Sequence, residues 1–467
     1  MRRLALAIAG VLAVAACAVG PDYHQPDVAV PDSVRGAAPG SDARSVGDSN
    51  WWDLYDDPKL RVLIDTALHN SPDVNAAIAR IDEARASLGQ SRLGFLPTVD
   101  GVADIRRSKA SIDARIPGAP RFSNSEDAAV TVSYELDFWG RLRRTHEAAR
   151  ATFLSSEFSK RAVLVSLVAN VANSYFSLLA LDSQLEITRR TVAARAKFVE
   201  LTRAQHERGY ATGLDVATAE AQAAAARANV PDLERRIGQT ENQICVLLGD
   251  NPHPIDREHR GEAMPVSPPL PPVGLPSQLL ERRPDVRAAE QSLHAANANI
   301  GVAKAALFPQ ITLTGLFGSL SAPLGGLFKA PTAEWSAAAG LVQPLLDSQR
   351  SIYQVELAHA RTREALFEYR KAVQTAFQET ADALLAYGKY GEFQREQATQ
   401  VEALRRAEAI ALARYRVGYA SYFDVINADR DLFTAELSLS QAYGNSLTAL
   451  VRLYQVLGGG WQSPPPS

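Results

Sequence analysis

The sequence predicts a mostly α-helical protein, built from two copies of one repeat, that joins identical chains to complete a membrane β-barrel. Three observations lead to this fold class. Short motifs recur at a nearly constant offset, two very long stretches lack proline and follow a heptad pattern, and each copy carries one strand hairpin. Because four strands per chain are too few to close a barrel, the same observations predict an oligomer.

The duplication is visible in motifs that recur along the chain. Ser71–Ala77 returns as Arg283–Ala289, an offset of 212 residues, with Pro-Asp-Val and Ala-Ala shared. Gly209–Val216 returns as Gly418–Val425 at an offset of 209. The second copy has therefore lost three residues between these landmarks, and repeats this long define the architecture of the chain.

The start of the chain is typical of a secretory signal peptide. The basic pair Arg2-Arg3 precedes an apolar run, Leu4–Val14, which is shorter than the roughly 20 residues of a membrane-spanning helix. Two alanines and Cys17 follow, a pattern similar to a bacterial lipobox, so we expect Cys17 to be acylated; a chance cysteine after an ordinary signal peptide is the alternative. Ala18 is not the aspartate associated with retention in the inner membrane, which favours the outer membrane. We expect no later segment to span a membrane as a helix.

Charge and cysteine content argue against several function classes. The formal net charge is −3, or −5 without Arg2 and Arg3, which disfavours nucleic acid as a partner. With Cys17 acylated, only Cys245 remains as a free thiol, so no disulfide or cysteine-based metal site is expected. The histidines of the stretch 253–259 lie in a proline-rich segment. We therefore expect no enzyme, no metal and no cofactor beyond a covalent lipid on Cys17.

Alternating residues predict one strand hairpin per copy. From Ala128 to Phe138 the even-numbered residues are apolar and the odd-numbered ones are polar or small. The same alternation marks the stretch 99–106, apart from Val102, and in the second copy the stretches 310–317 and 334–341. The connecting loops, about 107–127 and 319–333, are rich in Gly, Pro, Ser and charged residues and are expected at the surface.

Two helical stretches far exceed ordinary globular helices. Gly140–Arg208 and Ser348–Val417 contain no proline, and roughly 68 residues give about 100 Å of helix. Each copy opens with a shorter helix, in the first copy from about Asp73 to Phe95. We expect Pro231 to bend or break the helix that returns after the first long one. Seven-residue spacing of apolar residues predicts paired coiled-coil helices, as at Leu164, Val171, Leu178, Leu185, Val192 and Val199.

The number of strands bears on the size of the oligomer. Two chains would supply eight strands, a barrel nearly filled by its own side chains, whereas three would supply twelve and leave a water-filled lumen. The four long helical segments of each chain would then continue as a tube of twelve helices. A helix length near 100 Å suits a conduit across a periplasm.

Several motifs resemble those of outer-membrane efflux lipoproteins of the OprM/NodT type, in the TolC family of outer membrane factors. Cys17–Tyr23 with Pro26 resembles the start of their mature chains, Gly274–Asp285 resembles the signature at their repeat junction, and Tyr134–Arg141 resembles their passage from strand to helix. The resemblance implies a TolC-like homotrimer with a 12-stranded outer-membrane β-barrel, four strands per chain, and a long periplasmic coiled-coil α-barrel.

The resemblance also implies a function and partners. Such channels are the exit duct of tripartite pumps, which export small molecules or drugs. The implied partners are a periplasmic adaptor (membrane fusion) protein, an inner-membrane RND transporter driven by protons, and outer-membrane lipid. The protein is then lipid-anchored in the cell outer membrane and extends into the periplasm.

With this resemblance the chain divides into six segments. They are a lipoprotein signal peptide at 1–16, an N-terminal acylated segment and equatorial part at 17–70, repeat 1 at 71–250, a proline-rich equatorial linker at 251–283 with no helical periodicity, repeat 2 at 284–460, and a C-terminal tail at 461–467.

In the family, the turns after the long helices form the periplasmic tip, which opens and docks the adaptor. The corresponding turns here are Arg208–Val216 and Arg416–Val425. The resemblance implies that the adaptor contacts Gly209, Tyr210, Gly418 and Tyr419.

The resemblance assigns a gate to the same region. Asp215 and Asp424 are expected to contribute acidic rings near the constriction, and Tyr415 and Arg430 to clamp neighbouring helices by a hydrogen bond and a salt bridge. Asn427 stands where relatives often carry a second acidic residue, which argues against a strong cation-binding site.

The residues also allow a simpler interpretation of the gate. Thr212-x-x-Asp215 and Ser421-x-x-Asp424 both fit a capping box, in which the acidic residue stabilises a helix N-terminus. Arg430 fits a solvated position on a helix face. Capping and pore lining are compatible.

Two other functions compete with efflux. An outer-membrane outlet of a type I protein secretion system would use the same architecture, although the lipobox and the proline-rich junction favour drug efflux. A periplasmic coiled-coil scaffold held only by its lipid would need no barrel.

Overall fold

The structure, a computed structural model, describes residues 18–31, 35–36, 51–55, 57–113, 118, 120–257, 276–345 and 348–459. The signal peptide, Cys17, most of the proline-rich linker and the C-terminal tail lie outside the described residues. The chain folds into two compact units. We call them the sheet unit, from the described residues within 1–27, 80–156 and 288–370, and the helical unit, from the described residues within 28–79, 157–287 and 371–467.

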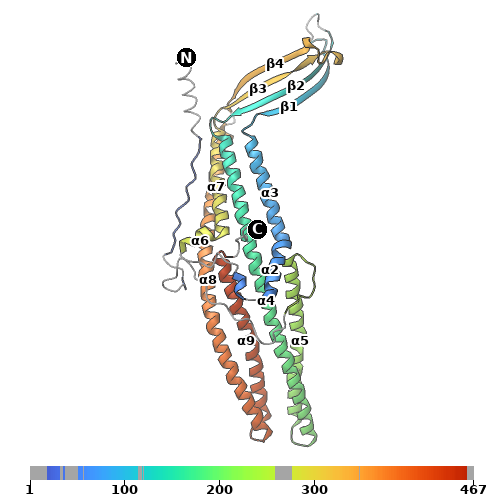
Figure 1. Cartoon of the computed structure of the whole chain (residues 1–467), viewed down its shortest axis with the longest axis vertical. Helices are drawn as coiled ribbons and strands as arrows, with labels where there is room; N and C mark the ends of the chain where they lie inside the picture. The colour runs from blue at the N-terminus through green and yellow to red at the C-terminus, as the bar shows by residue number, and fades with distance from the viewer. Residues whose placement is uncertain are drawn as a thin grey trace. The chain divides into compact units, whose positions relative to one another are not determined.

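Each copy follows the predicted order of helix, strand hairpin, long helix and returning helix (Figure 1). In the first copy these are α3 (Pro72–Leu93), β1 (Thr98–Lys109), β2 (Phe122–Leu136), α4 (Arg141–Glu207) and α5 (Gly213–Leu248). In the second they are α7 (Pro284–Ala305), β3 (Gln310–Ser321), β4 (Ala333–Val342), α8 (Ser348–Arg416) and α9 (Tyr422–Val456). The duplication and the two long helices are thus confirmed.

Shorter helices precede both copies. The 3-10 helix η2 (Trp51–Tyr55) and α2 (Pro58–Asn70) come before α3, and α6 (Pro276–Arg282) comes before α7. The prediction of an extended linker throughout 251–283 was therefore wrong at its end. A proline at the first helical position is compatible with helix geometry, and the buried side chain of Leu279 holds this helix against the protein core.

We expected Pro231 to bend or break the returning helix. The helix is not broken, because α5 is one continuous helix from Gly213 to Leu248. Proline removes the N–H that would bond the carbonyl four residues earlier, on Arg227. Both Pro231 and Arg227 are exposed, so water can satisfy that carbonyl.

The strands are longer than their alternation suggested. β1 extends to Lys109 and β2 begins at Phe122, so both ends of the expected loop 107–127 belong to the ladder. The loop expected at 319–333 contains the end of β3 and two short 3-10 helices, η3 (Leu324–Gly326) and η4 (Ala330–Thr332). Polar residues near the hairpin ends pair through their backbones, which a pattern of side-chain polarity does not reveal.

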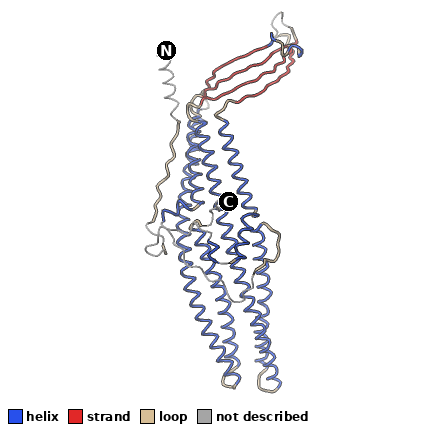
Figure 2. The backbone as a smooth tube through the Cα atoms, in the orientation of Figure 1, coloured by secondary structure: helices blue, strands red, loops and turns tan. Residues whose placement is uncertain are grey.

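The four strands form one antiparallel sheet in the order β1-β2-β3-β4 (Figure 1). Figure 2 shows this sheet in red. The central pairing, β2 with β3, joins the two copies. Among the described residues, β1 and β4 each pair on one side only. Because the number of strands is even, β1 and β4 run in opposite directions, so a β4 edge can continue the antiparallel pattern on a second chain's β1 edge.

The register sorts the side chains onto an apolar and a polar face. Val130 pairs with Phe317, which pairs with Trp335, and all three side chains are exposed in the single chain. The same face carries Val99, Ile105, Val132, Leu313 and Leu341. The opposite face carries Asp100, Asp104, Thr131, Ser133, Glu135, Thr312, Thr314 and Ser336. A sheet with an exposed apolar face and a polar face is typical of a membrane barrel.

The helical unit has a core rich in aromatic residues. Trp51 is 1% exposed and stacks on Tyr454 of α9, with ring centroids 5.3 Å apart. Asp57 caps α2 by accepting hydrogen bonds from the backbone N–H groups of Lys59 and Leu60, and it also accepts one from the Tyr175 hydroxyl of α4. These contacts fix η2 and α2 against the middle of α4.

One described helix, α4, is by length and composition apolar enough to cross a membrane, contrary to the expectation that no later segment would qualify. However, 61% of its most apolar 18-residue stretch is buried inside the protein. A buried apolar helix of this kind is typical of a protein core, because its apolarity serves packing against neighbouring helices.

A pair of neighbouring substitutions tests the two faces of the sheet. If the apolar face meets lipid, Val132→Arg should lower the free energy of unfolding by about 2–4 kcal/mol near the middle of the bilayer. Ser133→Arg, one residue further on the polar face, should cost much less. Denaturant titration of the protein folded in lipid vesicles measures both. Equal costs for the two substitutions would contradict the assignment of faces.

Candidate functional site

The two helical turns predicted as the tip have the same backbone geometry. Gly209 and Gly418 adopt positive φ angles of 78° and 82°, which favour glycine. The next residue in each turn returns a hydrogen bond to the preceding helix: Tyr210 N–H to the Gln205 carbonyl (2.8 Å) and Tyr419 N–H to the Arg414 carbonyl (2.8 Å). Both long helices therefore end in a Schellman-type cap. The Tyr210 and Tyr419 side chains are about four-fifths exposed, at 84% and 78%.

Both helices that follow these turns begin with a capping box. The Thr212 hydroxyl accepts from Asp215 N–H (3.2 Å), and the Asp215 carboxylate accepts from Thr212 N–H (2.8 Å). Ser421 and Asp424 repeat the arrangement at 3.3 and 2.9 Å. The hydrogen bond from Ser421 lowers the pKa of the Asp424 carboxyl below its ordinary value. The geometry thus gives both aspartates the capping role of the simpler interpretation, and Asp424 remains exposed.

Tyr415 connects α8 to α4. Its hydroxyl donates to the Gln205 side-chain oxygen at 2.7 Å, and burial together with Asp215 raises the pKa of this hydroxyl. Its ring lies 5.9 Å from Phe198 and 6.1 Å from Tyr422 of α9, and Phe198 stacks on Tyr422 at 5.0 Å. This aromatic group joins three helices just inside the turns.

Arg195 of α4 is the centre of a buried polar contact between α4, α5 and α9. Its Nε donates to Asp429 of α9 at 2.8 Å, and its Nη1 donates to the Gln222 carbonyl of α5 at 3.0 Å. The guanidinium also lies 5.2 Å from the ring centre of Phe433. Only 7% of Arg195 is exposed, so desolvation makes each of these contacts matter more than a surface pair would.

A second polar contact, between α4, α8 and α9, lies two turns further along α9. Glu436, 6% exposed, accepts from Arg190 of α4 at 2.5 Å and from Arg405 of α8 at 3.0 and 3.1 Å. One buried carboxylate thus links α9 to α8 and α4. We call Arg190, Arg195, Arg405, Asp429 and Glu436 the polar lock.

A cavity of about 310 Å³ lies beside the polar lock, between α4, α5, α8 and α9. Arg195, Glu408 and Asp429 line it together with Phe198 and Tyr422. Burial raises the pKa of Asp429, although Arg195 opposes this, and burial, Asp429 and Glu436 raise the pKa of Glu408. The cavity shows that the four helices leave space beside these ion pairs instead of packing closely at this level.

The remaining predicted gate residues do not cross between helices of this chain. Arg430 is exposed and forms an ion pair with its neighbour Asp431 at 3.0 Å, and Asn427 is partly buried on α9. The expected clamp by Arg430 is therefore not made within one chain. Among the described residues, no group of three or more His, Cys, Asp or Glu is placed to hold a metal ion.

Sequence reasoning missed the polar lock, although the heptad pattern contained a signal. The positions three residues after the apolar series 164–199 are also buried: Leu167, Ser174, Leu181, Thr188, Arg195 and Thr202. Arg195 is the one charged residue in that series. A charged residue at a coiled-coil core position needs a buried partner, and this requirement could have identified it.

Comparison with known proteins connects this geometry to a family. The sequence profile of the family described as Outer membrane efflux protein matches residues 63–250 and 275–459. The chain is 33% identical to the probable efflux pump outer membrane protein TtgC of Pseudomonas putida, over 98% of this chain and 95% of the relative. It is also 33% identical to the outer membrane protein OprJ of Pseudomonas aeruginosa, over 99% and 97%.

Solved structures share the whole fold. The outer-membrane channel OprN superposes with a TM-score of 0.88 and 31% identity, covering 96% of this chain and 100% of that one. The open state of the Neisseria gonorrhoeae MtrE outer membrane channel superposes with a TM-score of 0.83 and 30% identity, covering 96% and 99%. These comparisons confirm the predicted fold class, and the family and the relatives are channel proteins rather than enzymes. The chain therefore belongs to the outer membrane efflux protein family and is an outer-membrane channel of the efflux-pump type.

Proposed function

We propose that three copies of this chain form the exit duct of a tripartite efflux pump. The observation that carries the proposal is the four-stranded sheet with one apolar face and two edges, β1 and β4, that run in opposite directions. In lipid every backbone N–H and C=O needs a partner, so the edges must join other chains. Three sheets supply twelve strands, enough for a water-filled lumen lined by the polar face.

The long helices extend the lumen into the periplasm. α4 has 67 residues and α8 has 69, which corresponds to about 100 Å of helix each. This length supports a duct that meets a periplasmic adaptor and an inner-membrane RND transporter. The exposed side chains of Tyr210 and Tyr419, on turns shaped by Gly209 and Gly418, are the surface offered to the adaptor.

The exported compounds are small molecules. Relatives of this chain are named for toluene, solvent and antibiotic efflux, and we propose this range of substrates here. A duct with a wide lumen discriminates little, so the transporter that delivers the compound sets the selectivity. A protein secretion outlet is the alternative function.

The polar lock holds the narrow end of the duct closed. Arg195–Asp429 and Arg190–Glu436 join α4 to α9, and Tyr415–Gln205 joins α8 to α4. Ion pairs and hydrogen bonds can exchange their partners for water, unlike a close-packed apolar seam, so the α8–α9 pair can move against α4–α5. Asp215 and Asp424 support the gate by fixing the turns, and we propose that they line it in the trimer, with Arg430 and Asn427 close by.

Cys17 carries the lipid anchor in this proposal. Cys17 follows an apolar leader with small residues at its end, and Ala18 favours the outer membrane. Because the barrel itself spans the membrane, the lipid adds to membrane attachment without being its only source.

Deletion of the gene tests the substrate class. We expect the deletion strain to become several-fold more sensitive to apolar solvents and antibiotics, and a plasmid copy to restore resistance. The measurement is the minimal inhibitory concentration. Unchanged sensitivity together with loss of a secreted polypeptide would favour the protein secretion outlet instead.

Arg195→Met tests the polar lock. The substitution keeps the length of the side chain but removes hydrogen bonds from a charged group, so the channel should spend about tenfold more time open. Single-channel recording in planar bilayers measures the open fraction. Arg203→Met is the matched control, because Arg203 pairs with Glu220 within the exposed α4–α5 hairpin. Equal open fractions for the Arg195 variant and this control would refute the lock.

Cys17→Ser, exported through a signal peptide that does not direct acylation, tests the anchor. The unsubstituted protein should yield an acylated N-terminal peptide by mass spectrometry, and the variant should not. The variant should still fractionate with outer membranes, because its strands remain in lipid. Release into the soluble periplasmic fraction would favour the scaffold held only by lipid.

A further inference from the structure

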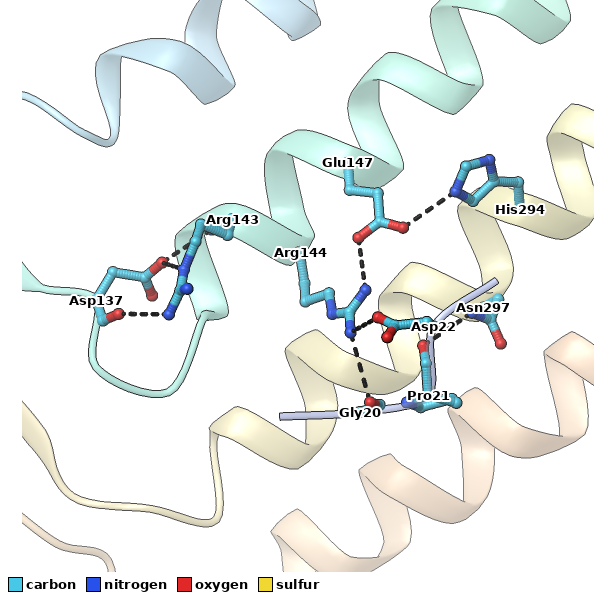
Figure 3. A network of polar contacts seen from close by, with 9 residues as sticks. All are labelled: Gly20, Pro21, Asp22, Asp137, Arg143, Arg144, Glu147, His294 and Asn297. Atoms are coloured by element: carbon cyan, nitrogen blue, oxygen red, sulfur yellow. Dashed lines mark hydrogen bonds and ion pairs between the residues drawn. The ribbon is translucent and has the colours of Figure 1, made fainter. Parts of the chain in front are cut away.

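Residues 18–23, here called the N-terminal strap, contact the beginning of α4 and the side of α7 in the sheet unit. Figure 3 shows Gly20, Pro21 and Asp22 in this position. Val19 N–H donates to the Trp139 carbonyl at 3.0 Å, in the corner between β2 and α4. The Asn297 side-chain amide of α7 donates to the Pro21 carbonyl at 3.0 Å. The strap therefore has backbone contacts with two different elements.

Arg144 of α4 is the centre of the contact (Figure 3). Its Nη2 donates to Asp22 Oδ1 at 2.7 Å and to the Gly20 carbonyl at 3.4 Å, while its Nη1 donates to Glu147 at 2.8 Å. Only 7% of its side chain is exposed. A guanidinium this deeply buried depends on its partners, and two of these partners belong to the strap.

His294 of α7 completes the site. Its ring stacks on Tyr23 with centroids 4.4 Å apart and planes 16° apart, and its Nε2 lies 3.0 Å from the Glu147 carboxylate. Glu147 thus holds both Arg144 and His294 in position. The strap contacts a set of side chains that are already connected to one another.

Glycines allow the backbones to approach closely. A Cβ atom on Gly301 would lie 2.7 Å from Arg144 Cγ and 2.8 Å from the Val19 carbonyl oxygen. A Cβ on Gly20, which has a φ of 115°, would lie 2.6 Å from Gly301 Cα. Gly140 likewise leaves no room for a Cβ, which would lie 2.7 Å from Ala18 Cβ. These distances are shorter than any normal contact, so the strap fits only because the glycines are there.

The duplication provides an internal comparison. Gly89 of α3 corresponds to Gly301 at the offset of 212, yet a Cβ on Gly89 would meet nothing within 4 Å. At the same offset, Asp82 and Arg85 stand in place of His294 and Asn297. Only the second copy's helix therefore carries the strap-binding residues, so the contact is not a by-product of the repeated fold.

We propose that Arg144, Glu147, His294, Asn297 and Gly301 form a docking site for the N-terminal strap that holds it folded independently of the lipid. Cys17 directly precedes Ala18, whose Cβ reaches the β2–α4 corner at Gly140. Consecutive Cα atoms are 3.8 Å apart. A lipid on Cys17 would therefore be attached one residue away from this corner of the sheet unit. This positional consequence, unlike docking itself, rests on the proposed acylation of Cys17.

Hydrogen exchange of the full-length purified protein, carrying Cys17→Ser so that no lipid is attached, tests the docking. The peptide containing residues 18–23 should be protected. Gly301→Ala and Arg144→Met should each accelerate its exchange about tenfold or more, because each displaces contacts made by a charged group. Gly89→Ala, at the corresponding position of the first copy, should leave its exchange unchanged.

The oligomer and the strand peptides are followed in the same experiment, so a folding defect is recognised. If Gly301→Ala does not fold, the exchange rate of the strap peptide in Arg144→Met decides whether the docking site exists. Exchange of the strap peptide at the rate of an unstructured peptide in the unsubstituted chain, or equal protection in all folded variants, would overturn the docking site. Neither result depends on pump activity. Failure of the docking site can therefore be distinguished from failure of the proposed efflux function.

Discussion

The unpaired backbone at the two edges of the sheet is the constraint on which the rest of this protein depends. A four-stranded sheet leaves N–H and C=O groups on β1 and β4, and a membrane offers them no partner. An even number of strands makes the two edges antiparallel, so identical chains can satisfy one another. The register also places apolar residues on one face, since a shift by one residue would turn every side chain to the other face. Closure and membrane exposure thus follow from one hydrogen-bond pattern.

In the proposed duct the long helices have a different task, because they form a wall that opens at one end. Along most of α4 an apolar heptad series supplies the packing, including Leu167, Leu178 and Leu185. Toward the turns, the buried series three residues later on α4 contains Arg195, and contacts to α9 become ion pairs beside a cavity. Buried ion pairs add less stability than apolar packing of the same volume. In the proposed gate, these ion pairs can exchange their partners for water, which an apolar seam cannot do.

Duplication gave two copies that kept the same turns but diverged elsewhere. Both tips have a glycine with positive φ and a capping box of a hydroxyl residue with an aspartate. Both copies thus need the same sharp reversal of a long helix. By contrast, Gly301 lies against the strap while Gly89 faces open space, and Arg195 of the first copy supplies the guanidinium that reaches Asp429 of the second. The features that both copies share therefore follow from the backbone geometry of the turns. The features that differ follow from contacts with other segments of the chain.

The sequence by itself determined the order and type of the elements within each copy, the lengths of α4 and α8, and the capping boxes at Asp215 and Asp424. These depend on local spacing: period two for strands, period seven for coiled coils, and three residues from cap to carboxylate. Tertiary structure alone decided the tolerance of Pro231, the full length of β2, the partners of Arg195 and Glu436, and the docking of the strap on Arg144. In each case a polar group is satisfied either by a distant segment or by water. The spacing of residues along the sequence does not contain that information.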